Sequence, residues 1–224
     1  MKKIIVNTDI PRTMLNKLST LFEYSIEFCE KCDYFDGSVA SHADMNFLCI
    51  RNKLFTIPDV FGNHSKNDEK LKYPHDVKLN AYCVGDDFLC KTDSVYSGAL
   101  EYAKNAGMNI IHVNQGYLKC NLVVVNEAEK AVITEDKGIA KILTANGYDV
   151  LLLNTHAVKL EPYEHGFIGG ASGNIDGKIV FTGKIENHPE FNVIKAFLDK
   201  HNAEYVSLSD DALYDYGSIL LIDI

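Results

Sequence analysis

The sequence has only two arginines, Arg12 and Arg51. Its 22 basic side chains are outnumbered by 31 acidic ones, so the net charge is −9 and no basic surface for nucleic acid or an anionic membrane is evident. It also has no apolar run near the ~18 residues that a membrane span needs, and its N-terminus turns polar after three apolar residues. These absences predict a soluble, cytoplasmic protein that binds neither nucleic acid nor membrane.

What remains is an ordinary globular composition. Hydrophobic residues make up 46% and charged residues 24% of the chain, which excludes the disordered, collagen-like and coiled-coil classes. A length of 224 residues suits one large domain or two small ones. The acidic balance suits a small cationic molecule as a partner, and the sequence leaves a homo-oligomer open.

The placement of the six cysteines indicates reduced thiols rather than disulfides. Cys29 and Cys32 have the spacing of a redox pair or of half a zinc site, but no second Cys or His pair stands near them. We therefore predict no metal and no other cofactor, and we keep a redox role for this pair as a third hypothesis. The other four lie in apolar stretches expected to be strands, where free thiols behave as small hydrophobes: Cys49, Cys83, Cys90 and Cys120.

A unit of about 35 to 45 residues recurs along the chain, in the order strand, strand, helix, strand. The clearest copy has expected strands at 120–126 and 130–134, a helix over 137–146 stopped by Gly147, and a strand at 149–154. The copies on either side follow the same order. The expected first strands of all units are 44–50, 77–84, 120–126, 166–172 and 217–224.

Two of the units are irregular. After strands at 44–50 and 53–57, the polar segment 61–73 predicts a short or absent helix and a mobile loop. The last unit is split between the chain ends, because 217–224 is a first strand and 1–30 holds a second strand, a helix and a third strand. Pairing the two ends would close a ring and remove exposed strand edges.

We therefore expect one α/β domain over residues 1–224, a β/α propeller of five pseudo-symmetric ββαβ units. The alternative is a doubly wound sheet, which expects one strand per helix. Three copies with two strands before each helix, and the lack of a Gly-x-Gly-x-x-Gly motif, favour the ring. The units span 42–76, 77–114, 119–154, 165–210, and 215–224 together with 1–30.

Five such units around a pseudo-fivefold axis resemble the pentein fold, that of the guanidino-group-modifying enzymes. These are arginine and agmatine deiminases, dimethylarginine hydrolases and amidinotransferases, and a non-enzymatic ribosome anti-association factor shares the fold. The chain is most similar to an uncharacterised bacterial family with this fold. Since fold alone does not give function, local motifs must carry the enzymatic interpretation.

Two motifs are similar to those of the enzymes. His42-Ala-Asp44 resembles the family's His-x-Asp, in which the histidine is the general acid/base and the aspartate grips the guanidinium. The stretch from Gln115 to Cys120 contains Gly-x-x-x-Cys, which resembles the motif of the family's nucleophile. Cys120 lies two units after His42, as the cysteine does in the family, although the chain would be permuted around the ring.

The resemblance implies a hydrolase acting on C–N bonds, or an amidinotransferase, with Cys120 as nucleophile, His42 as general acid/base and Asp44 as substrate carboxylate. A guanidinium carbon is a poor electrophile, so a thiolate must attack it. A histidine titrates near neutral pH and can protonate the departing amine. Carboxylates hold a cation by charge-assisted hydrogen bonds.

The chain departs from the family in its acids and arginines. The family's carboxylate on a glycine-rich strand is missing beside Gly169, and the spare candidates are Asp215, Asp76 and Glu164. With so few arginines, a substrate without a carboxylate, such as an agmatine-like amine, would be easier to hold. His165, beside one of these acids, is a secondary candidate for the pocket.

Three asparagines occupy matching positions at the first strands, and Cys120 precedes one of them. This residue therefore has a second interpretation, as the small apolar residue of a repeating strand start. The asparagines could cap strand ends at the centre or line a pocket, as could Gln115 and the acids above. The leading hypothesis remains an enzyme, and the alternative is a non-catalytic protein that binds a small molecule or a macromolecule. The asparagines are Asn46, Asn80 and Asn121.

Overall fold

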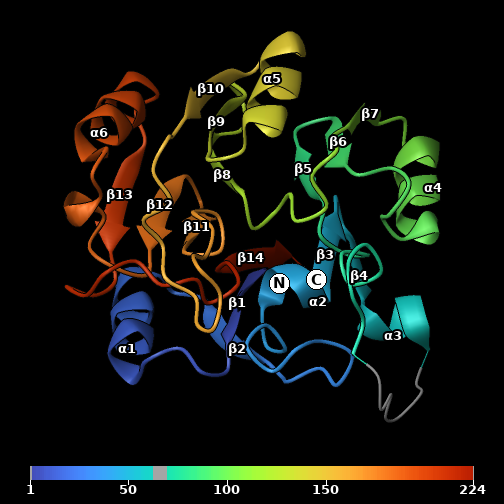
Figure 1. Ribbon diagram of the computed structural model, residues 1–224, viewed down its shortest axis with the longest axis horizontal. Coiled ribbons are helices and arrows are strands. Elements are labelled where there is room, and N and C mark those ends of the chain that lie inside the picture. Colours follow the sequence, from blue (N-terminus) through green and yellow to red (C-terminus); the bar gives the residue numbers. More distant parts are fainter. Residues whose placement is uncertain (1, 63–69, 224) are drawn as a thin grey trace.

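The computed structural model describes residues 2–62 and 70–223 (Figure 1). Their strands form five small sheets, four with three strands and one with two. In Figure 1 the longer helices lie at the periphery and the first strand of each sheet lies nearer the centre. The strands are β1 (Lys2–Asn7), β2 (Ser25–Cys29), β3 (Phe47–Ile50), β4 (Lys53–Thr56), β5 (Tyr82–Val84), β6 (Asp87–Cys90), β7 (Asn109–His112), β8 (Leu122–Asn126), β9 (Ala131–Thr134), β10 (Asp149–Leu152), β11 (Ser172–Ile175), β12 (Lys178–Phe181), β13 (Glu204–Ser207) and β14 (Leu220–Asp223).

Each three-stranded sheet pairs its first two strands antiparallel and its last two parallel. In the sheet β8-β9-β10 the parallel pair is joined through a helix that packs its apolar side inward. A parallel pair needs such a crossover, whereas an antiparallel pair needs only a tight turn. The helices are α1 (Arg12–Leu21), α2 (Ala43–Asn46), α3 (Ile57–Phe61), α4 (Ser97–Asn105), α5 (Lys137–Ala145) and α6 (Phe191–Lys200), with a 3-10 turn η1 (Ile185–Asn187).

The two ends of the chain share one sheet, as expected. Strand β14 pairs antiparallel with β1, and Lys2 lies opposite Asp223. Strand β1 then pairs parallel with β2. Strand β14 therefore covers the edge that β1 would otherwise expose.

The sheet β3-β4 has no third strand among the described residues, and the helix after it, α3, has five residues. Within the predicted loop 61–73, residues 63–69 lie outside the described residues. No helix in the described ranges is long and apolar enough to cross a membrane.

The first strands begin later than predicted. Residues 166–171 are not a strand, because the Ala171 amide donates to the Phe167 carbonyl and the segment turns before β11. Likewise, residues 43–46 form the short helix α2, and 77–81 and 217–219 precede β5 and β14. The apolar residues in these segments are buried in turns. Local alternation of apolar residues does not distinguish such a turn from a strand.

Cys120 also lies outside the strand predicted for it. The Asn121 amide donates to the Tyr117 and Leu118 carbonyls, so a turn carries Cys120 and β8 begins at Leu122. The other three cysteines expected in strands lie in β3, β5 and β6. All six cysteines are free thiols in the described chain.

Candidate active site

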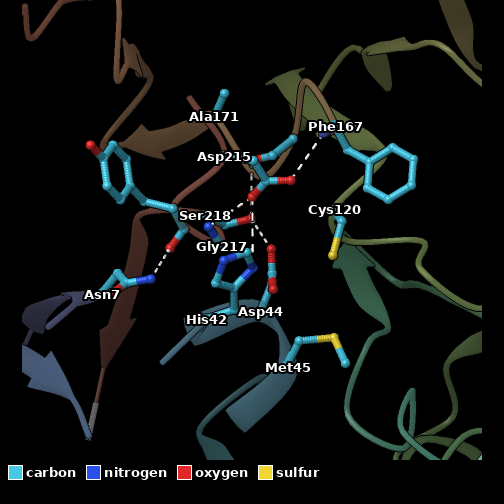
Figure 2. Close-up of polar contacts among 12 residues, drawn as sticks. Asn7, His42, Asp44, Met45, Cys120, Phe167, Ala171, Asp215, Gly217 and Ser218 are labelled. Carbon is cyan, nitrogen blue, oxygen red and sulfur yellow. Dashed lines mark hydrogen bonds and ion pairs between the residues drawn. The ribbon is translucent and has the colours of Figure 1, made fainter. Parts of the chain in front are cut away.

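The candidate site lies where the chain turns before the first strands. His42 immediately precedes α2, Asp44 is within it, Cys120 lies before β8 and Asp215 lies before β14. Figure 2 shows these side chains converging, with Met45 beside them. Segments at or just before the predicted first strands therefore bring three distant parts of the chain together.

His42 and Asp215 form a buried pair. The Nδ1 atom of His42 lies 3.7 Å from Oδ1 of Asp215, and both side chains are at most 3% exposed. The amides of Phe167 and Gly217 each donate to Asp215 at 2.9 Å. Burial raises the pKa of Asp215 to about 6; His42 opposes this rise and Asp44 adds to it. Asp215 is thus the spare acid that lies beside the histidine.

Asp44 is fully buried and only partly satisfied. Its Oδ2 accepts a hydrogen bond from the Ser218 hydroxyl at 2.8 Å. Its Oδ1 has no hydrogen-bond partner among the described residues. Because a buried, unpaired carboxylate oxygen is costly, this atom is suited to receive a donor from a bound molecule.

Cys120 is buried, and its surroundings oppose loss of its proton. The side-chain Nδ2 of Asn80 donates to the Cys120 sulfur at 3.0 Å. The side-chain Oδ1 of Asn80 accepts from the Lys119 backbone amide at 2.6 Å. Burial raises the pKa of the Cys120 thiol well above its ordinary value, and Asp44 and Asp215 raise it further. These surroundings therefore favour the thiol over the thiolate.

Three of these side chains face a cavity of about 430 Å³, which Asp44 and Asn80 do not line. His42, Cys120 and Asp215 line it together with Met45. Aromatic side chains form much of the remaining wall. They are Phe35, Tyr73, Tyr117, Tyr163 and Phe167.

A larger hollow of about 690 Å³ is lined by Lys119, Cys49 and Cys83 among others, but by neither His42 nor Cys120. The groups that the chemistry needs therefore face the smaller cavity.

Other predicted residues fall into two groups. His165 and Asp76 line the cavity, whereas Glu164 is exposed and does not. Asn46 and Asn121 donate to nearby backbone carbonyls and hold the turns.

Gln115 bonds to Asp136 and to the Tyr117 amide, away from the cavity. Burial raises the pKa of Cys29 to about 12, which is opposite to the lowered pKa of a reactive redox thiol.

The sequence did not single out Glu135, a buried acid behind the site. Its Oε2 accepts the Ile168 amide at 3.0 Å, and burial raises its pKa to about 7. His156 lies 3.7 Å from its other oxygen and stacks on His165, with ring centroids 4.1 Å apart. In the sequence, the one signal that could have singled out Glu135 is that it directly follows Thr134, the threonine that ends a predicted second strand.

Ligand atoms of His42, Asp44 and Asp215 lie within 4.8 Å of one another. Two carboxylates and an imidazole at this spacing can hold a metal ion, and they can equally hold an organic cation through charge-assisted hydrogen bonds. The geometry is thus suited to a cation of either kind.

A model described as a family of unknown function (DUF6873) matches residues 5–220, and no curated protein matches the chain. Three solved structures of dimethylarginine dimethylaminohydrolase are similar to it. The adduct with S-methyl-L-thiocitrulline is 10% identical, with a TM-score of 0.55 over 99% of this chain and 100% of that one.

The Pseudomonas aeruginosa enzyme, a cysteine-to-serine mutant complexed with citrulline, is 9% identical, with a TM-score of 0.56 over 98% of this chain and 100% of that one. The adduct with 4-chloro-2-hydroxymethylpyridine is 11% identical, with a TM-score of 0.55 over 99% and 100%. At these identities the likeness shows the fold alone, and the predicted pentein fold is confirmed.

Proposed function

We propose that this chain, which belongs to the family of unknown function DUF6873, is a cysteine-dependent enzyme that hydrolyses, or transfers part of, a small guanidine- or amidine-like molecule. One observation carries the proposal: Cys120, His42 and Asp215 line a single cavity. Asp44 has a carboxylate oxygen within 4.8 Å of ligand atoms on His42 and Asp215, and its Oδ1 has no hydrogen-bond partner among the described residues; both observations support a cationic substrate.

The proposal includes a closed ring. We take the five sheets as five units around one centre, closed by the pairing of β14 with β1. In such a ring the turns before the first strands face a common axis, which accounts for residues from distant parts of the chain meeting at one cavity.

Binding would come first. A planar guanidinium presents N–H donors that match carboxylate oxygens. Asp44 offers an oxygen without a partner among the described residues, and Asp215 offers a second carboxylate, which accepts two backbone amides and lies 3.7 Å from His42. The bound cation would offset the two carboxylates that now raise the Cys120 pKa, so binding itself would favour the thiolate.

The reaction would then run in two halves. His42 takes the proton of the Cys120 thiol as the sulfur attacks the guanidinium carbon and forms a C–S bond, and it then gives this proton to the leaving nitrogen as the C–N bond breaks. Neutral His42 next takes a proton from water, which attacks the same carbon. The C–S bond breaks, and a ureido product and the thiol are released. In a transferase, an amine would replace the water.

Residue-resolved alkylation by mass spectrometry tests this function. We expect a small cationic amidine electrophile to label Cys120 selectively, and Asp44→Asn to slow that labelling at least tenfold. Neutral iodoacetamide should not show this dependence. Asp86→Asn is the matched control, because Asp86 is exposed and pairs with Arg51. Cys120 that stays inert to the amidine until the protein unfolds would contradict the proposal.

A non-catalytic binding protein is the second candidate. The buried Cys120 thiol, held by Asn80, favours it. In that case guanidines should bind and protect the fold, while Cys120 stays inert and no product forms.

A further inference from the structure

We infer that the guanidine- or amidine-like molecule bound in this cavity has a flat aromatic ring in its tail, which packs on the aromatic wall and donates a hydrogen bond to Asp76. The part of the wall concerned, which we call the aromatic platform, consists of the rings of Tyr73, Tyr117 and Phe167. This inference rests on the proposed function, because it names the class of molecule that the same cavity takes.

The aromatic platform is a row of rings with similar orientations. The ring centroids of Tyr73 and Tyr117 are 5.7 Å apart, and their planes are inclined by 33°. Those of Tyr117 and Phe167 are 6.3 Å apart and inclined by 26°. Aromatic rings at such spacings attract one another through their quadrupoles as well as by burying area. A further aromatic ring gains both terms from this row, whereas a saturated ring of the same size gains only the burial.

The aromatic platform runs from the proposed catalytic groups to the surface. At its inner end, the backbone amide of Phe167 donates to Asp215, the acid that lies beside His42 (Figure 2). At its outer end, Tyr73 is 47% exposed, and Tyr163, which lines the same cavity, is 48% exposed. Large apolar side chains left exposed at the mouth of a cavity are typical of a binding surface. A guanidinium held at Asp215 would therefore direct its tail along the platform.

Gly116 holds the outer ring of the platform in place. A Cβ atom at Gly116 would lie 2.6 Å from Cε2 and 3.3 Å from Cζ of Tyr73, so any larger residue would displace this ring. Gly116 is also the glycine of the Gly-x-x-x-Cys motif that ends at Cys120. The Tyr73 ring thus has a fixed seat although it is half exposed, and a surface that is already ordered loses little freedom when a ligand binds.

Asp76 provides a hydrogen-bond acceptor at the edge of the platform. Its Oδ2 accepts the Tyr117 hydroxyl at 2.6 Å, and its Oδ1 is buried without a hydrogen-bond partner among the described residues. Because a buried acceptor without a partner is costly, a donor on the bound ring would satisfy this oxygen. A phenol hydroxyl there would repeat the contact that Tyr117 already makes.

The basic side chains of the cavity do not form a clamp for a carboxylate tail. No arginine of the described chain lines it, and Arg51 faces the other hollow. Of the two lysines that line it, Lys70 donates to the Asp33 carbonyl at 2.7 Å, and Lys72 is exposed. An uncharged aromatic tail needs no such clamp.

The test measures direct binding by titration calorimetry, in the Cys120→Ser protein to prevent turnover. Three of the probes share one linker and differ in the ring, namely 2-(4-hydroxyphenyl)ethylguanidine, 2-phenylethylguanidine and 2-cyclohexylethylguanidine, and the fourth is 4-aminobutylguanidine. The phenyl compound should bind about threefold more tightly than the cyclohexyl compound, because only an aromatic ring adds quadrupole attraction. The hydroxyphenyl compound should bind about threefold more tightly again, because its hydroxyl satisfies Oδ1 of Asp76.

Variants of the platform assign these preferences to its residues. Gly116→Ala displaces the Tyr73 ring, and Tyr73→Leu removes the ring without adding a Cβ at Gly116, so both should abolish the preference for phenyl over cyclohexyl. Asp76→Asn should reduce the added affinity of the hydroxyphenyl compound, because an amide nitrogen cannot accept its proton. Gly37→Ala is the matched control, since Gly37 is exposed and a Cβ there would meet nothing within 4 Å. It should leave both preferences intact.

Equal binding of the phenyl and cyclohexyl compounds would overturn the inference and leave the proposed function standing. Tightest binding of 4-aminobutylguanidine would overturn it in the same way. If none of the four guanidines binds, the proposed function and this inference both fall.

Discussion

Two of the buried carboxylates around the site, those of Asp215 and Glu135, accept hydrogen bonds from backbone amides. Asp215 accepts the Phe167 amide, and Glu135 accepts the amide of the next residue, Ile168. Two acids thus hold consecutive peptide groups of one turn. Amide dipoles offset only part of the desolvation cost of an ionised carboxylate, which is why both acids have raised pKa values.

Glu135→Gln should change how stability depends on pH. The folded pKa of about 7 lies above the ordinary 4.5, so folded Glu135 keeps a proton that the unfolded chain loses. Its contribution to the free energy of unfolding therefore falls as pH rises from about 4.5 to 7, by at most about 3 kcal/mol. A glutamine at this position can keep the hydrogen bond from the Ile168 amide, and it does not titrate, so its contribution to the free energy of unfolding does not fall as pH rises.

Urea unfolding at pH 5 and pH 8 checks this. The variant should gain stability relative to the parent chain between the two values. Parallel changes in both proteins would show that Glu135 does not carry the raised pKa.

Among the elements, helix α5 shows how nearby residues in the sequence begin a helix, bury one side of it and end it. Asp136 accepts the Ile139 amide at 2.8 Å and caps the helix, while Ile139 and Leu143 are buried beneath it. Gly147, at a φ of 81°, follows the last turn. The Asp136 side chain thus satisfies one of the free backbone amides at the start of α5.

Asp136→Ala should lower the free energy of unfolding by about 1 kcal/mol, measured by urea denaturation. Asp136→Asn keeps the acceptor oxygen and should cost less than half of that. Asp136 also accepts from Gln115, so Gln115→Ala separates the two bonds. If Asp136→Asn lowered the free energy of unfolding as much as Asp136→Ala does, the capping role would be contradicted.

At the scale of the whole molecule, Lys119 connects separate parts of the chain. Its buried ammonium donates to the carbonyls of Asp44, Phe47 and Leu79, and burial lowers its pKa to about 8. One side chain beside Cys120 thus satisfies backbone groups from α2, from β3 and from the segment before β5.

Lys119→Met should destabilise the fold by at least about 2 kcal/mol, because three buried carbonyls lose a donor. Lys195→Met on α6 is the control, since that lysine is exposed and pairs with Asp199 on the same helix. It should change the midpoint of thermal unfolding far less. Similar effects of the two substitutions would show that the Lys119 contacts are not a joint of the structure.

The sequence by itself determined the pentein fold and the pairing of the chain ends. Strand periodicity, helix stops such as Gly147 and short turns are local properties, so a single chain displays them. The sequence also placed His42 and Cys120 in one candidate site, and both line the same cavity.

Only the tertiary structure decided where the first strands begin and which acid lies beside the histidine. Cys120 lies in a turn, and Asp215 rather than Glu164 faces His42. It also decided that burial raises the pKa of Cys120 and of Glu135, and that Glu135 and Asp76 each bury a carboxylate oxygen that has no hydrogen-bond partner among the described residues. These features depend on burial and on contacts between residues far apart in the chain. Desolvation has no signature in residue spacing.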